Sequence, residues 1–323
     1  MNTDRSQRWR ERRDLYRPAG EVFDPSRFDV QPIASDTVAR EFLERHHYLG
    51  GMGAAVHRYG LYYKAAFLRE ELVGVAVLGV PANDHVIPAW APGLHPREGL
   101  DLNRFVLRDE CADGTPIAGN AETWFLRHVF EQLKADERRL RQQAADLARG
   151  VPLNLPSKKA ARLRAGRAPL RIVVAYSDPM PRRDLDGALT MPGHIGDIYK
   201  AFSGRHVGRA RRRKILLTPN GCTLDERGRS KLAAALDPVK GRGNRYVYEQ
   251  LQTLGLPTRT FGEAPKDYLD RALAEGVRRG VLREVEHPGN LVYAWPLTNA
   301  GRDALRPSLP YPTLAEYGLP VEP

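Results

Sequence analysis

The stretch GNAETWFLRHVFEQL, residues 119–133, decides how this chain is expected to fold. Phe125, Val129 and Leu133 recur every four residues, which predicts a helix whose apolar face packs on a sheet. Asn120 is a favourable N-cap for that helix. The free N–H groups of its first turn suit a phosphate, but an ordinary sheet-packing helix explains the pattern equally well.

Three neighbouring segments extend this helix into a larger unit. LDLNRFVL, residues 100–107, alternates as a strand does, and RIVVAYSDP, residues 171–179, is typical of a buried strand. GHIGDIYKAF, residues 193–202, predicts a second helix, which carries a Tyr. The order strand, helix, strand, helix favours an α/β fold with a parallel strand pair and a ligand at the carboxyl ends of the strands.

Two further elements precede this core. Residues 35–48 predict a helix capped by Ser35 and ending at two glycines. Residues 58–80 predict an antiparallel hairpin, whose second strand is apolar enough to be central in a sheet. The complete expectation is a mixed central sheet with flanking helices.

Composition limits the possible classes of protein. The chain has 323 residues, which suggests two domains, and 50 Lys and Arg against 39 Asp and Glu give a net charge of +11. This balance favours polyanionic partners such as nucleic acid. Cys111 and Cys222 provide neither a disulfide framework nor a zinc-thiolate site. No apolar run approaches about 20 residues and no signal core is present, so we expect a cytoplasmic protein that does not enter membranes.

Basic residues concentrate in two segments beside the predicted ligand site. Residues 134–170 form an expected insertion with ten Lys and Arg, and residues 204–217 carry six with no acid and predict a last strand. Either segment is a candidate grip for nucleic-acid phosphates, and a solvated surface is the alternative. The expected DNA-binding residues are Arg162, Arg164, Arg205, Arg209, Arg211, Arg212 and Arg213.

The C-terminal third suggests a separate domain. Residues 244–306 predict two helices, a hairpin and a short helix, an order that resembles a winged helix only loosely. The expected organisation is a basic arm over 1–34, a catalytic domain over 35–217, and a linker with the winged-helix-like domain over 218–323.

Six ordered blocks, HHYLG, YGLYY, LNRFVL, GNAETWFL, YSDP and GHIGDIYKAF, resemble the Mom family of phage DNA-modification proteins. The element order likewise resembles the GNAT acyltransferase fold. The resemblance implies transfer of a carbamoylmethyl-type group to the exocyclic N6 of adenine in double-stranded DNA, which protects the DNA from restriction. It also implies a phage- or prophage-encoded protein that acts in the host cell.

The matching blocks imply a set of site residues. The catalytic candidates are Asp178, Arg104, Tyr199, His47 and Tyr48. The candidates for binding substrate or cofactor are Tyr59, Thr123, Gly119, Asn120 and His194. No metal is expected, because the spacing of the histidines matches no metal signature.

The residue types suit such a reaction. Adenine N6 is a poor nucleophile, so a base such as Asp178 must accept its proton. Arg104 interrupts a strand and is expected to meet Asp178 or a cofactor phosphate, because a buried charge needs a partner. Tyr199 suits protonation of a leaving thiolate or stacking on a base. A flipped-out adenine would stack on an aromatic ring such as Tyr48 or Tyr59.

The group donor is the least specified part of this hypothesis. Acetyl-CoA or a related acyl donor is expected from the GNAT resemblance, yet only Ala118-Gly119-Asn120 stands where a glycine-rich pyrophosphate loop belongs. Two alternatives remain open: an acetyltransferase that acts on protein, RNA or a small molecule, and a non-catalytic winged-helix DNA-binding protein.

Overall fold

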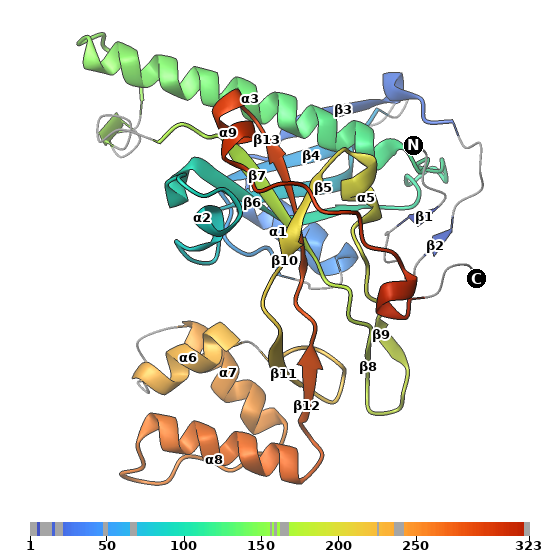
Figure 1. Ribbon diagram of the computed structural model, residues 1–323, viewed down its shortest axis with the longest axis vertical. Coiled ribbons are helices and arrows are strands. Elements are labelled where there is room, and N and C mark those ends of the chain that lie inside the picture. The colour runs from blue at the N-terminus through green and yellow to red at the C-terminus, as the bar shows by residue number, and fades with distance from the viewer. Residues whose placement is uncertain are drawn as a thin grey trace. The chain divides into compact units, whose positions relative to one another are not determined.

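The computed structural model describes residues 5–6, 15–16, 22–47, 51–64, 70–155, 157, 160–161, 168–224, 226–235 and 242–319. They form two compact units (Figure 1). The first unit contains residues 1–178, 194–210 and 290–323, and the second contains residues 179–193 and 211–289. Each unit is described separately below.

A seven-stranded mixed sheet organises the first unit, with strand order β10-β13-β7-β6-β5-β4-β3. All neighbours are antiparallel except β6 and β7, which run parallel. The strands are β3 (Phe28–Pro32), β4 (His57–Tyr63), β5 (Glu71–Gly79), β6 (Gly99–Leu107), β7 (Ile172–Ser177), β10 (Arg205–Arg209) and β13 (Leu291–Pro296). A separate two-stranded sheet joins β1 (Arg5–Ser6) to β2 (Leu15–Tyr16).

Helices cover both faces of the main sheet (Figure 1). They are α1 (Asp36–His46), α2 (Val86–Trp90), α3 (Ala121–Ala148), α5 (Asp197–Ala201) and α9 (Asn299–Ala304), with 3-10 turns η2 (Pro25–Arg27), η3 (Pro96–Glu98) and η4 (Ala315–Tyr317). The predicted α/β class and the GNAT-like order of hairpin, β6, α3, β7 and α5 are therefore confirmed. No helix in the described ranges is both long and apolar enough to cross a membrane.

Helix α3 packs as its sequence predicts. Phe125, Val129 and Leu133 are fully buried against the sheet. Asn120 occupies the N-cap position, but its side chain makes no capping hydrogen bond. The helix runs for 28 residues, and its last buried residue is Glu137. The first part of the basic segment 134–170 is therefore the polar end of α3, which extends past the sheet (Figure 1).

The parallel pair of β6 and β7 is short. Its register joins Gly99 to Ile172, Leu100 to Val173 and Asp101 to Val174, and no later residue of β6 pairs with β7. The carboxyl-terminal halves of the two strands therefore belong to one sheet without sharing a hydrogen-bond ladder. Asp178 directly follows β7 at this end.

The second unit combines two small sheets with three helices. Hairpin β8 (Arg182–Arg183) with β9 (Leu189–Met191) and the pair β11 (Arg213–Leu217) with β12 (Arg283–His287) are antiparallel. The helices are α6 (Glu226–Ala235), α7 (Arg242–Thr253) and α8 (Pro265–Arg278). Leu224, Leu251, Tyr268 and Ala272 are fully buried in its core.

The predicted wing is wrong, because β12 and β13 do not pair with each other. Strand β12 pairs with β11, whereas β13 lies between β10 and β7 in the main sheet. The physical reason is visible in their burial: residues 291–295 are all buried, as a central strand requires, and β12 alternates between exposed and covered residues. The predicted last strand over 204–217 is in fact two strands, β10 and β11, one in each unit.

Candidate functional site

A bulge in β6 sets the geometry of the candidate site. The β5–β6 register shifts so that Val77 faces Arg104 while Leu78 faces Leu102. Asn103 is the extra residue, and its Nδ2 donates to the carbonyl of Ala54 at 2.6 Å. A bulge of this kind re-aims the side chains that follow it.

Because of this bulge, Asp101 and Arg104 share one face of the sheet. Directly paired residues of an antiparallel ladder point to the same side, and Asp101 pairs with Gly79 as Arg104 pairs with Val77. Val77 belongs to the core cluster beneath α1. The carboxyl of Asp101 and the guanidinium of Arg104 therefore lie on the α1 side, close enough to influence each other electrostatically.

Backbone carbonyls hold the Arg104 guanidinium. Its Nε donates to the carbonyl of Gly51, and its Nη1 donates to the carbonyl of Asn103 at 2.6 Å. These bonds fix the cation against the loop that leads from α1 to β4. The expected arginine is thus an ordered, partly buried positive charge.

Two histidines, His47 and His194, lie near this part of the site. His47 is the C-cap of α1, and its backbone N–H donates to the carbonyl of Leu43. Burial, the charge of Arg104 and the proximity of His194 lower the pKa of His47 to about 3. The His47 imidazole is therefore neutral at pH 7 and offers one donor and one acceptor nitrogen.

His194 and Asp178 meet where the chain returns to the first unit. The backbone N–H of His194 donates to the carbonyl of Asp178 at 2.8 Å. Both residues are largely buried, at 6% and 9% exposure. His47 lies close enough to Arg104 and to His194 for both to lower its pKa, and Asp178 adjoins His194 through the backbone hydrogen bond.

Asp101 is the functional candidate that our sequence analysis missed. Burial raises the pKa of Asp101 to about 7, although the positive charge of Arg104 opposes the rise. Its carboxylate accepts no hydrogen bond from the residues that the structure describes. A carboxyl group that titrates near pH 7 beside a fixed cation has the properties of a general base. The hint in the sequence was an acid between two leucines of a predicted strand.

Strand β7 places an aromatic side chain on the same face of the sheet as Asp101, because Asp101 pairs with Val174 and Tyr176 follows two residues later. Trp90 Nε1 donates to the hydroxyl of Tyr176 at 3.1 Å. Burial raises the pKa of Tyr176 to about 12, and the charge of Asp101 contributes to this rise. An indole and a phenol therefore border the site next to the end of the parallel ladder.

Tyr199 and Tyr59 lie in a different core cluster, which contains the buried face of α3. Tyr199 is 7% exposed and packs against Tyr293 and Trp295, with ring centroids 5.4 and 5.6 Å away. Tyr59 is 1% exposed, and its hydroxyl donates to Asp136 at 2.9 Å. Burial raises the pKa of Tyr59 above its usual range. Neither ring is displayed on the surface of the described structure.

The N-terminus of α3 holds three other expected residues. Thr123 Oγ1 donates to the carbonyl of Asn120 at 3.0 Å, so the hydroxyl is used within the first turn. Gly119 is partly buried and Asn120 is exposed. Glu122 stands in the same turn and is 7% exposed. An acid at this position, with a single preceding glycine, does not fit a coenzyme A pyrophosphate held in the usual way.

The expected DNA-binding residues fall into three groups. Arg205 and Arg209 belong to β10 in the first unit, and Arg209 is exposed. Exposed side chains in the second unit include Arg211, Arg212 and Arg213, of which Arg213 lies 3.8 Å from Glu226. Arg162 and Arg164 lie outside the described residues, as does the catalytic candidate Tyr48.

Residues 27–150 match the model of the Mom protein family. The match confirms the resemblance indicated by the sequence blocks. It covers the chain from β3 through α3 and includes His47, Asp101 and Arg104, whereas Asp178 and His194 lie beyond the Mom match. It supports a DNA-modifying role.

Two other comparisons cover different shares of the chain. Over 96 residues the chain is 30% identical to the DNA-directed RNA polymerase subunit beta′ of Lachnoclostridium phytofermentans. This stretch is 28% of the present chain and spans only 7% of that curated relative. The structure is also similar to a tandem GNAT protein from the clavulanic acid biosynthesis pathway, solved without AcCoA. That likeness has a TM-score of 0.34 and 8% identity, and it covers 84% of this chain and 99% of that one.

Proposed function

We propose that this chain is a DNA-modifying transferase that places a small acyl-derived group, of carbamoylmethyl type, on N6 of adenine. The observation that carries the proposal is the position of Asp101, Arg104 and His47 within the segment that matches the Mom family. Such a modification would shield DNA from restriction enzymes.

The chemistry assigned to these residues follows from their charges. N6 attacks the electrophilic carbon of the donor, the new nitrogen–carbon bond forms, and the leaving group departs with its electron pair. A carboxylate takes the proton that N6 loses. Asp101 suits this task because its pKa lies near 7, and Asp178 at the end of β7 is the second candidate.

Arg104 and His47 support the same step, and neither residue gains or loses a proton during it. The fixed Arg104 guanidinium stabilises negative charge that develops on the donor, since its geometry is set before the reaction begins. Neutral His47 is available as a hydrogen-bond partner for the adenine edge or the donor. No step is assigned to coenzyme A, because the residues that precede α3 do not fit its pyrophosphate.

The substrate is proposed to be duplex DNA with the target adenine flipped out, because N6 is engaged in pairing inside the helix. Exposed arginines such as Arg209 and Arg211 would contact the phosphates. This contribution is expected to weaken as salt concentration rises.

Mass spectrometry of nucleosides from plasmid DNA tests the proposal. We expect a new deoxyadenosine species after expression of the wild type, and its mass identifies the transferred group. Arg104→Ala and Asp101→Asn should abolish it, while Asp303→Asn, an exposed acid on α9, serves as the matched control. If DNA stays unmodified in the native host and with its extract, the proposed reaction is wrong and acetyl transfer to another substrate takes its place.

A further inference from the structure

Asp101 and Tyr176 are polar residues of neighbouring strands on one face of the main sheet. In the parallel register Asp101 pairs with Val174, and Tyr176 follows on the same face two residues later. With strands about 4.8 Å apart and a rise of about 3.3 Å per residue, the Cα atoms of Asp101 and Tyr176 lie about 8 Å apart. Both side chains retain some exposed surface, whereas Val174 is fully buried. This face therefore presents a carboxyl group and a phenol close together.

Trp90 fixes the oxygen of this phenol. Its Nε1 donates to the hydroxyl of Tyr176 at 3.1 Å. The indole is itself confined, because a Cβ at Gly208 would lie 2.5 Å from Trp90 Cζ3. The carbonyl of Trp90 also accepts a hydrogen bond from the backbone N–H of Arg306 at 3.0 Å. The hydroxyl oxygen of Tyr176 thus has a defined position before any substrate binds.

The bond from Trp90 also determines what the hydroxyl of Tyr176 can still do. A phenol has one proton to donate, and an oxygen that accepts from an indole N–H directs that proton elsewhere. Within the described residues this O–H has no acceptor, and the carboxylate of Asp101 has no donor. The pKa of Tyr176, at about 12, keeps the phenol protonated at neutral pH. The pair therefore offers a substrate one O–H donor and one carboxylate acceptor.

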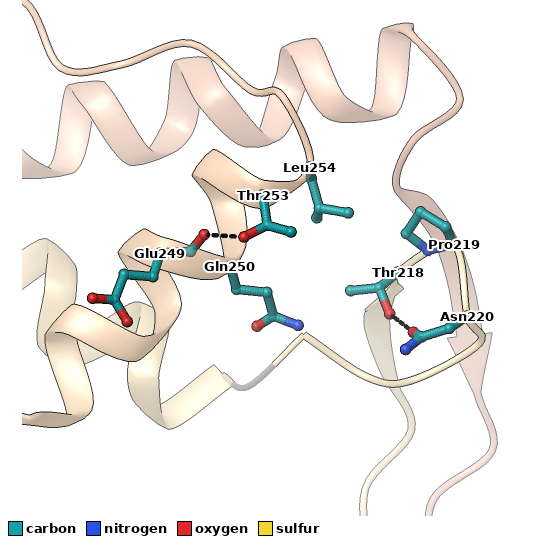
Figure 2. A pocket seen from close by; sticks show the side chains of 7 residues that line it. All are labelled: Thr218, Pro219, Asn220, Glu249, Gln250, Thr253 and Leu254. Atoms are coloured by element: carbon teal, nitrogen blue, oxygen red, sulfur yellow. Dashed lines mark hydrogen bonds between the residues drawn. The ribbon is translucent and has the colours of Figure 1, made fainter.

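The second unit has a pocket with a different set of groups. It has a volume of about 440 Å³ and lies between the turn that follows β11 and the C-terminal half of α7 (Figure 2). Its described lining includes the exposed carboxylate of Glu249 and the amides of Asn220 and Gln250, but no tyrosine or histidine. None of the residues discussed for the transfer reaction lines it. The combination of a partly buried acid with a positioned phenol therefore belongs to the main sheet.

The Watson–Crick edge of adenine is complementary to an acceptor beside a donor. N6–H is a donor, and the ring nitrogen N1 next to it is an acceptor. When N6 loses its proton, part of the negative charge is delocalised onto N1, so a hydrogen bond to N1 also stabilises the reacting base. Guanine presents the reverse order, with an acceptor at O6 and a donor at N1, and its O6 would face the carboxylate.

We propose that Tyr176 donates a hydrogen bond to N1 of the flipped-out adenine while Asp101 accepts one from N6–H, so that Tyr176 determines specificity for this base. The inference rests on the proposed function, because it states how the same site recognises its substrate. The proton of N6 still passes to the carboxylate, and the phenol keeps its own proton throughout.

Binding of the full chain to three DNA duplexes tests this role. Each duplex carries one base opposite an abasic site, and that base is adenine, 1-deazaadenine or 7-deazaadenine. An unpaired base needs the least energy to leave the stack. At pH 8 the wild type should bind adenine about fivefold more tightly than 1-deazaadenine, because one hydrogen bond contributes about that factor. The 7-deaza base retains N6 and N1 and should bind as adenine does.

Two matched variants assign this preference to one hydroxyl. Tyr176→Phe should bind adenine about fivefold more weakly than the wild type and should bind adenine and 1-deazaadenine equally, because the contact has already been lost. Tyr62→Phe is the control, since Tyr62 is partly exposed on β4 and its hydroxyl has no hydrogen bond among the described residues. This control should keep the wild-type preference. Thermal unfolding of both variants verifies that the fold is retained.

The outcomes distinguish this inference from the proposed reaction. Equal binding of adenine and 1-deazaadenine by the wild type, or an unchanged preference in Tyr176→Phe, overturns the role of Tyr176 even if modified nucleosides are found. A preference that is lost in Tyr176→Phe supports the role, even if mass spectrometry finds no modified deoxyadenosine and the proposed reaction fails. A preference against 7-deazaadenine alone would place the donor at N7 and overturn the contact with N1.

Discussion

Burial shifts the pKa values of Asp101 and His47 in opposite directions. The pKa of Asp101 is raised to about 7, and that of His47 is lowered to about 3. Both shifts favour the neutral form, because the protein hydrates a charge less well than water does. Arg104 is consequently the residue among these three that stays fully charged at pH 7. It is therefore best suited to attract an anionic atom.

The pH dependence of the reaction should identify the proton acceptor. If Asp101 accepts the proton, the rate rises as pH increases through about 7, because the ionised carboxylate is the active form. Rates of nucleoside modification from pH 5 to 9 measure this. Asp101→Asn should lose both the activity and the rise, whereas a rise that persists in Asp101→Asn would assign the proton to Asp178.

The pH dependence of the unfolding free energy should reveal the raised pKa of Asp101 without any measurement of activity. The raised pKa of Asp101 means that the folded state retains a proton that the unfolded chain loses near pH 4. Wild-type stability therefore falls as pH rises from about 4 to about 7. Asp101→Asn should remove this fall and be more stable above pH 7 by on the order of 4 kcal/mol. Denaturant unfolding at pH 4 and pH 8 measures the difference, which should be small at pH 4.

His47 should destabilise the fold in acid. Its pKa is lowered from 6.5 to about 3. Between these two pH values the unfolded chain binds a proton at this imidazole, whereas the folded state does not. Stability is therefore present above the unfolded pKa and is lost as pH falls from about 6.5 toward 3. His47→Gln should flatten this loss, and His85→Gln, at the exposed start of α2, is the control. An equal acid sensitivity in wild type and His47→Gln would contradict the buried, neutral imidazole.

The sequence blocks predicted His47 and Arg104 as site residues, because polar residues in apolar surroundings stand out in a strand or at a helix end. They did not identify Asp101. Its neighbours alternate regularly, and only the bulge at Asn103 reveals that Asp101 shares a face with Arg104. A bulge adds one residue to a ladder and leaves no reliable trace in the pattern of hydrophobic residues.

At the scale of elements, the bulge depends on a glycine in the neighbouring strand. A Cβ at Gly79 would lie 1.8 Å from the carbonyl oxygen of Ala54 and 2.2 Å from Asn103 Nδ2. Gly79→Ala should therefore displace the loop whose Gly51 carbonyl holds Arg104, and it should cost about 1–3 kcal/mol of unfolding free energy.

The control for this substitution lies in the same strand. A Cβ at Gly74 would meet only side-chain atoms at 3.1–3.3 Å, which can move, so Gly74→Ala should cost less. The measurements are urea unfolding and nucleoside modification. Removing the Asn103 side chain in the Gly79→Ala background should not restore stability, because the clash with the Ala54 carbonyl remains.

Strand pairing marks the limit of what the sequence could predict for the elements. Hairpin β4–β5, the parallel pair β6–β7 and helix α3 follow from local periodicity and order. The partners of β13 do not, because the turn after β12 is compatible with a hairpin and the actual partners come from residues 172–177 and 205–209. The even burial of β13 would have indicated a central strand more strongly than a wing.

At the scale of the whole molecule, the second unit is inserted at two points of the first. The flanks of each insertion meet in a backbone hydrogen bond, from His194 N–H to the Asp178 carbonyl and from Ala210 N–H to the Asn290 carbonyl, both at 2.8 Å. The first unit therefore has a continuous sheet regardless of what lies between these flanks. The first of these hydrogen bonds holds Asp178 and His194 next to each other in the candidate site.

This architecture predicts which deletions are tolerated. Joining Ala210 to Asn290 through an Asn–Gly turn removes residues 211–289 and should leave a folded first unit, because the antiparallel pair β10–β13 suits a two-residue hairpin. A chain that stops at residue 224 lacks β13 and should not fold. Circular dichroism and cooperative thermal unfolding of both proteins measure this. A cooperative transition in the chain that stops at 224 would contradict the central position of β13.

The late position of β13 in the chain has a consequence for synthesis on the ribosome. Residues 291–296 fill the gap between β7 and β10, so the growing chain carries two open strand edges until this strand has been translated. Open edges pair readily with other chains. Nascent chains of this protein should therefore depend on chaperones until residues 291–296 emerge, and messages that end before them should yield aggregates rather than a folded first unit.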